Sequence, residues 1–189
     1  VDGDTSTSDT CLLVATGAKP INGAAIKSAD DKRLAAFKKA LSRLMQDLAQ
    51  QVARDGEGIT KLMTIEVSGA ENNAAARQIA LAIGNSPLVK TAIAGGDANW
   101  GRIVMAVGKS GEKAERDKLA ISIGGVKVAR QGKVVPGYRE APVARHMKGK
   151  EISIAVNVGV KSGKGAGQAR IWASDLTHGY ISINADYRS

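Results

Sequence analysis

The sequence predicts a mixed α/β fold of the α+β type, and two periodicities carry that prediction. Residues 30–54 place apolar side chains at spacings of three and four, which is typical of an amphipathic helix. Later runs, such as 62–68 and 151–160, are rich in β-branched side chains, as strands are. Glycine pairs at 95–96 and 124–125 predict tight turns between such elements. We therefore expect helices and strands to mix along the chain.

The first part of the chain predicts a polar loop followed by a strand. Residues 2–10 are rich in Asp, Gly, Ser and Thr, whose side chains bond to nearby backbone in turns. The run 11–15 is apolar throughout, which predicts a strand buried on both faces. Cys11, the only cysteine, is then expected to be a buried small side chain rather than a reactive thiol. Because Val1 is not an initiator methionine, we expect a piece of a longer precursor.

The helix expected over 30–54 is the clearest single element. Ser28 or Asp30 is suited to cap its start, and Gly56 to end it. The basic residues fall mostly off its apolar stripe, so the simplest interpretation is a solvated face. The stripe comprises Leu34, Phe37, Leu41, Leu44, Leu48 and Val52.

A boundary near Gly58 separates this segment, 1–58, from an α+β region, 59–189. In the second region the patterns predict helices at 72–84 and 142–147, and strands at 62–68, 118–123, 126–130, 133–135, 151–160, 169–173 and 180–184. Gly124-Gly125 and Gln131-Gly132 are expected to form hairpin turns.

Two stretches of the second region need separate treatment. The stretch 85–108 predicts a strand or short helix after Pro87, a glycine turn, and a new helix capped by Asp97 or Asn99. The glycine-rich run 159–167 resembles a phosphate-binding loop. However, Gly165 stands where a magnesium-binding hydroxyl is required, so we expect a mobile hairpin loop instead.

The composition argues against several classes of protein. No apolar run approaches the length of a membrane span and no signal-peptide pattern is present, which predicts a cytoplasmic protein. The formal charge of +9 raises nucleic acid as a partner, but the basic residues are scattered and aromatics make up only 3% of the chain. Nucleic-acid binding therefore ranks below an anionic metabolite or an acidic partner chain.

His146 and His178 have no second ligand at metal spacing, so no zinc site is expected.

The residues do not assemble a self-contained active site. The sequence has no Gly-x-Ser-x-Gly elbow, no paired Cys and His, and no metal cluster. Glu57 lies between Gly56 and Gly58, where a ligand could approach the backbone closely and a carboxylate could bind an ammonium group. From the residues alone, a solvated loop glutamate is the simpler interpretation.

Several short segments follow one another along the whole chain in a recognisable order. They are VDGDTSTSDT at the start, DGEGITK at 55–61, SPLVKTAI and Gly-x-Asp-x-Asn-Trp-Gly-Arg-Ile within 85–108, and SINADYRS at the end. Together they resemble the β chain of the ornithine acetyltransferase family, the bifunctional glutamate N-acetyltransferases of arginine biosynthesis. The chain departs from the family pattern at Ser8, Ala98 and Ser189, where Asn, Pro and Thr are usual, and in its basic loop 161–168.

The resemblance implies a more detailed fold and a reaction. Residues 1–58 would belong to an αββα-type self-processing acyltransferase sandwich, and 59–189 would form a smaller α+β domain whose tail returns to the active site. Acetyl would move from N-acetylornithine to glutamate through an acetyl-threonine, formed on the threonine that becomes N-terminal when the precursor cleaves itself. That threonine is expected upstream of Val1 and the oxyanion-hole donors on the α chain, so no catalytic residue is expected in this chain.

The resemblance also implies substrate-binding residues and partners. Glu57, Asn184 and Ser189 carry over as substrate-binding residues, so we expect an ordered tail that points towards Glu57. The implied assembly is a heterotetramer of two α and two β chains. No cofactor is implied, and the use of acetyl-CoA as an acetyl donor stays open. Two alternatives also stay open: a self-processing aminopeptidase of related architecture, and a basic nucleic-acid-binding module.

Overall fold

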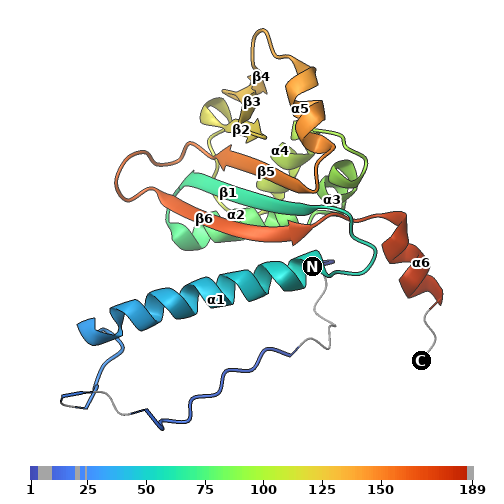
Figure 1. Cartoon of the computed structure of the whole chain (residues 1–189). Coiled ribbons are helices and arrows are strands. Elements are labelled where there is room, and N and C mark those ends of the chain that lie inside the picture. Colours follow the sequence, from blue (N-terminus) through green and yellow to red (C-terminus); the bar gives the residue numbers. More distant parts are fainter. Residues whose placement is uncertain (4–9, 20–21, 24, 187–189) are drawn as a thin grey trace.

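The computed structural model describes residues 1–189 apart from 4–9, 20–21, 24 and 187–189. Its centre is a sheet whose strands lie in the order β4-β3-β2-β5-β1-β6 (Figure 1). β1 runs parallel to β5, and the other neighbouring pairs are antiparallel. The strands are β1 (Leu62–Ala70), β2 (Ala120–Ile123), β3 (Val126–Arg130), β4 (Lys133–Val134), β5 (Glu151–Asn157) and β6 (Gly167–Ser174).

Helices lie on the sheet and along its β6 edge. They are α1 (Ala35–Arg54), α2 (Asn73–Gly84), α3 (Pro87–Ala94), α4 (Trp100–Lys109), α5 (Glu140–Met147) and α6 (His178–Asp186), with short 3-10 turns at Lys32–Leu34 and Arg116–Lys118. α2 packs on β1 and β6 and also contacts α3 and α4. α1 lies along β6, and α6 extends from the same end of the sheet at which β1 begins (Figure 1). The mixed α/β fold class is therefore confirmed.

The hydrophobic core is formed by the inner face of the sheet and the helices that cover it. β5 alternates strictly, with Ile152, Ile154 and Val156 buried and the residues between them exposed. β1, which has a strand on each side, is apolar and buried over most of its length. Ile79 and Ile83 of α2 are fully buried in the same cluster. Each such side chain contributes about 1.5–3 kcal/mol by leaving water.

Most predicted elements are confirmed. The helices expected at 72–84 and 142–147 are α2 and α5, and the element after Pro87 is the short helix α3. Both expected hairpin turns have positive φ at their two central residues, for example 59° at Gly124 and 75° at Gly125, as type I′ turns require. The helix expected over 30–54 is α1, which begins at Ala35 after a 3-10 turn capped by Asp31 rather than by Ser28 or Asp30.

The prediction of a buried strand at 11–15 is wrong. This segment belongs to no strand, and Cys11 is exposed instead of buried. Leu12, Leu13 and Val14 are 82%, 72% and 80% exposed. An apolar run forms a buried strand only when other strands pair with it, and the described part of the chain offers it none.

Two predictions near the C-terminus are also wrong. Residues 180–184 form part of helix α6 rather than a strand, and the alternating Ile181 and Ile183 are 60% and 47% exposed. The loop 159–167 does not close a hairpin, because β5 and β6 lie on opposite sides of β1 and the loop passes the end of β1 between them. In both cases the local order of residues does not reveal which elements become neighbours in the fold.

The apolar stripe of α1 forms as predicted but is not buried in this chain. Phe37, Leu44, Leu48 and Val52 are 60%, 54%, 39% and 47% exposed. Ala53 is the one buried residue of the helix. A contiguous apolar face of this kind is typical of an interaction surface.

Candidate functional site

The predicted residue Glu57 lies in the turn that joins α1 to β1. Gly58, its neighbour, has φ of +64°, a conformation that favours glycine. A Cβ atom at Gly58 would also clash with the backbone of Gly179 and Tyr180, at the start of α6. The turn and α6 therefore pack backbone against backbone, which only glycine allows.

Asn184 lies on α6 and meets Glu57. Its Nδ2 atom donates a hydrogen bond of 2.7 Å to Oε2 of Glu57 and another of 3.0 Å to the carbonyl of Tyr180. The fold thus joins two of the three predicted site residues across 127 positions in sequence. Both side chains are exposed to solvent. Ser189, the third, lies outside the described residues.

A buried carboxylate holds the segment that follows Glu57. Oδ1 of Asp175 accepts hydrogen bonds from the backbone N–H groups of Thr60 (2.8 Å) and Lys61 (3.1 Å), and its Oδ2 accepts one from the Thr60 hydroxyl (2.6 Å). Asp175 is 1% exposed. The Thr177 hydroxyl donates to the carbonyl of Gly58. The segment that joins β6 to α6 therefore fixes the turn that carries Glu57 and contacts the start of the helix that carries Asn184.

Lys90 of α3 is the second buried charge beneath the site. It is fully buried, and its Nζ donates to the carbonyls of Val1 and Ser174 and to the Ser174 hydroxyl. Burial lowers the pKa of Lys90 to about 8, while the carboxylates of Asp175 and Asp2 oppose that shift. Sequence reasoning missed Asp175 and Lys90 as members of the site. A charged residue inside an apolar run, as Lys90 is within 88–93, was the available signal.

The stretch 85–108, which carries much of the family resemblance, supplies helix caps as well as Lys90. The hydroxyl of Ser86 accepts from the backbone N–H of Val89 at the start of α3. Asn99, not Asp97, caps α4 by accepting from the backbone N–H of Arg102 at 3.2 Å. Arg102 in turn donates to the carbonyl of Leu88, which ties α4 to α3. This stretch therefore builds the support on which Lys90 is placed.

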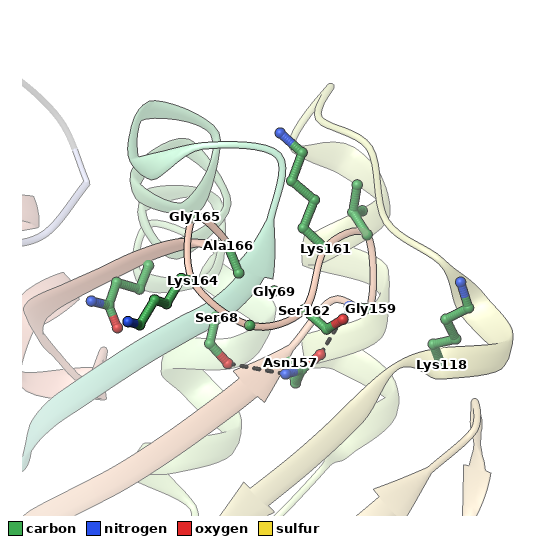
Figure 2. Close-up of a pocket in the computed structure, with 14 residues that line it drawn as sticks. Ser68, Gly69, Lys118, Asn157, Gly159, Lys161, Ser162, Lys164, Gly165 and Ala166 are labelled. Atoms are coloured by element: carbon green, nitrogen blue, oxygen red, sulfur yellow. Dashed lines mark hydrogen bonds between the residues drawn. The ribbon is translucent and has the colours of Figure 1, made fainter.

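A separate cavity of about 720 Å³ lies at the other end of β1 (Figure 2). It is lined by the loop 159–168 together with Ser68, Gly69, Lys118 and Asn157. Its lysines do not converge, because Lys161 extends away from the loop and donates to the carbonyl of Glu71. The cavity lies beyond the last residues of β1, whereas Glu57 precedes the first, so it is not part of the site at Glu57.

The described residues hold no cluster of three or more His, Cys, Asp or Glu side chains that could bind a metal ion. His146 accepts a hydrogen bond of 3.0 Å from the backbone N–H of Ser153, which gives it a structural partner. Within the same described ranges, no helix has the length and apolar character needed to span a membrane.

Comparison with known proteins identifies the family. A family model described as the ArgJ family matches residues 1–189. The chain belongs to the ArgJ family. It is 58% identical over 191 residues to the arginine biosynthesis bifunctional protein ArgJ of Zymomonas mobilis, and 57% identical over 189 residues to that of Gluconobacter oxydans. These matches cover 100% of the chain but 45% and 43% of the relatives, so the chain spans less than half the length of these curated proteins.

A solved structure supports the same assignment. The crystal structure of arginine biosynthesis bifunctional protein ArgJ from Bacillus halodurans superimposes with a TM-score of 0.87 at 39% sequence identity. The superposition covers 99% of this chain and 84% of that chain. The resemblance to the ornithine acetyltransferase family is therefore confirmed over the length of this chain.

Proposed function

We propose that this chain is the β-chain portion of a glutamate N-acetyltransferase, which moves acetyl from N-acetylornithine to glutamate. The observation that carries the proposal is the hydrogen bond between Asn184 and Glu57. It brings together two residues that the family resemblance independently implies for substrate binding. The ArgJ relatives, named for a bifunctional role in arginine biosynthesis, support the same pathway.

Glu57 and Asn184 offer the groups that an amino-acid substrate requires. A carboxylate binds a substrate ammonium group by a charge-assisted hydrogen bond, and an amide both donates and accepts. In the structure the Asn184 amide donates a hydrogen bond to Oε2 of Glu57. A bound ammonium group would donate to Oε2 in place of that amide, and the released amide N–H would then donate to the substrate carboxylate. Ser189 would add its hydroxyl to the same site.

The nucleophile and the oxyanion-hole donors would come from outside this chain. A threonine hydroxyl attacks the acetyl carbonyl of N-acetylornithine, its proton passes through the threonine α-amine to the departing ornithine nitrogen, and an acetyl ester remains. The α-amine of glutamate then attacks that ester, which yields N-acetylglutamate and restores the hydroxyl. Glu57 would bind the free side-chain ammonium group of N-acetylornithine in the first half-reaction, and Asn184 and Ser189 would orient the substrate carboxylate in both.

We further propose an α chain of the same precursor as the partner, in a heterotetramer of two α and two β chains. The exposed apolar face of α1, with Phe37, Leu44 and Leu48, supports a partner because such a face is costly to leave in water. The exposed run Leu12–Val14 adds to the same kind of surface. We place the reaction in the cytoplasm, in keeping with a single unpaired cysteine.

The test is to express the full-length precursor and supply N-acetylornithine and glutamate. We expect N-acetylglutamate and ornithine in equal amounts, and a fragment beginning with threonine in the intact-mass spectrum. Glu57→Gln should raise the KM for N-acetylornithine at least tenfold, with Glu112→Gln, a change remote from Glu57 in sequence, as the matched control. Hydrolysis of peptides without acetyl transfer would instead favour the aminopeptidase.

A second arm of the same test addresses the acetyl donor. Acetyl-CoA is supplied with glutamate in the absence of N-acetylornithine, and N-acetylglutamate is measured again. Product in this arm would show that the enzyme also takes acetyl from acetyl-CoA. Its absence, with the first arm active, would show a monofunctional transferase.

A further inference from the structure

Lys90 is fully buried, yet each of its three N–H donors has an acceptor within reach. These acceptors are the carbonyl of Val1 at 2.6 Å, the carbonyl of Ser174, and the hydroxyl of Ser174 at 3.2 Å. The Ser174 hydroxyl itself donates to the Val1 carbonyl at 2.6 Å. The ammonium group therefore joins three segments that are distant in sequence: residue 1, α3 and the end of β6.

Burying an ammonium group costs the hydration free energy of its charge. A methionine of similar length would occupy the same volume without losing the hydration of a charge. Lysine is almost never fully buried unless its charge is compensated, and here Asp175 and Asp2 provide the opposing charge. The placement of this charge therefore calls for a reason beyond packing.

Two routes lead from Lys90 to the turn that carries Glu57. In the first, Lys90 holds Val1, whose side chain packs directly on Gly56, where a Cβ atom would clash with it. In the second, Lys90 holds Ser174, which precedes Asp175 and its hydrogen bonds to the backbone of Thr60.

The second route also reaches the helix that carries Asn184. The carbonyl of Lys90 accepts from the backbone N–H of Leu176 at 3.4 Å. The next residue, Thr177, donates to the Gly58 carbonyl and accepts from the backbone N–H of Gly179 at 3.0 Å. The Leu176 bond belongs to the backbone of residue 90, whereas the buried amine is connected to both ends of the Glu57–Asn184 contact through Ser174 and the residues that follow it.

We propose that Lys90 is a positioning residue for the substrate site, which fixes the Gly56–Gly58 turn through Val1 and Ser174 so that Glu57 faces Asn184. This role rests on the proposed acetyl transfer. Lys90 does not touch the substrate and acts only through Glu57. Its loss should therefore weaken substrate binding only while Glu57 is able to bind.

The experiment is a double-mutant cycle in the full-length enzyme, with Lys90→Met, Glu57→Gln and the combination of the two. We expect Lys90→Met alone to raise the KM for N-acetylornithine about tenfold and to lower kcat less than threefold. In the Glu57→Gln background the same substitution should change KM less than twofold, because residues that act through one contact are not additive. Lys109→Met, an exposed lysine on α4, is the matched control and should leave both constants unchanged.

Equal effects of Lys90→Met in the two backgrounds would overturn the proposal, as would an unchanged KM. Ser174→Ala provides a second variant if Lys90→Met does not fold, since it removes one acceptor and opens little space. A KM rise of about threefold is expected.

Hydrogen exchange supplies a readout that needs no turnover: the amides of Thr60 and Lys61 should exchange at least tenfold faster in Lys90→Met. If the wild-type enzyme makes no N-acetylglutamate, the proposed function fails, and unchanged amide exchange would separately refute the positioning role.

Discussion

Replacement of Lys90 by Met should change how the stability of the protein depends on pH. Burial lowers the pKa of Lys90 from 10.5 to about 8 in the folded chain, whereas an unfolded lysine keeps a pKa of about 10.4. Between these two values the unfolded chain binds more protons than the folded chain. The stability contributed by this side chain therefore rises with pH across that window and is constant below it.

The size of the effect follows from the shift. One pKa unit corresponds to about 1.4 kcal/mol, so a change from 10.5 to about 8 corresponds to roughly 3 kcal/mol. Methionine carries no such titration. The free energy of unfolding of the wild type, minus that of Lys90→Met, should therefore increase by about 3 kcal/mol between pH 8 and pH 10.5.

Urea unfolding followed by circular dichroism, at half-unit steps from pH 7 to pH 10.5, measures this difference. Lys109→Met serves as the control, because Lys109 is exposed on α4 and should follow the wild type at every pH. Apart from Lys90 and Lys109, every residue is common to the three proteins, so the contributions of the common residues cancel in the difference. Parallel curves for wild type and Lys90→Met would show that the amine is not desolvated as described.

Three further predictions address the other features. Gly58→Ala should destabilise the protein by at least about 2 kcal/mol, because a left-handed φ and a backbone clash act together, and hydrogen exchange should show α6 released. Asn72→Ala should cost about 1 kcal/mol by thermal denaturation, since its side chain caps α2 at 2.9 Å; an unchanged midpoint would argue against the cap. Phe37→Gln with Leu44→Gln should leave circular dichroism unchanged but reduce recovery of the partner chain on co-purification, whereas full recovery would remove α1 from the interface.

The fold could be predicted from sequence wherever local chemistry decided the outcome. Periodicity found α1 and α2, and the dipeptides Gly124-Gly125 and Gln131-Gly132 found the hairpin turns because few residues other than glycine tolerate positive φ. The sequence could not show that β1 lies between β5 and β6, because strand pairing depends on contacts distant along the chain. For the same reason, the alternation of Ile181 with Ile183 could not be distinguished from that of a paired strand.

The site could be predicted only in part, and for a related reason. Glu57 and Asn184 came from family resemblance, since neither has a local pattern that separates it from an ordinary surface residue. Their meeting depends on Asp175 and Lys90, whose roles arise from burial. Burial of a charge is a property of the assembled chain, so no spacing rule could have assigned it.

The place of β1 in the sheet also determines when the candidate site at Glu57 can form during synthesis. β1 is synthesised well before either strand that flanks it, and its neighbours start at Glu151 and Gly167. A nascent polypeptide that ends before Glu151 therefore holds an unpaired β1, and one that ends before Asn184 holds Glu57 without its partner. Such non-local pairing slows folding. The contact between Glu57 and Asn184 thus awaits synthesis of α6, and removing that helix would abolish the contact while leaving the earlier strands and helices in place.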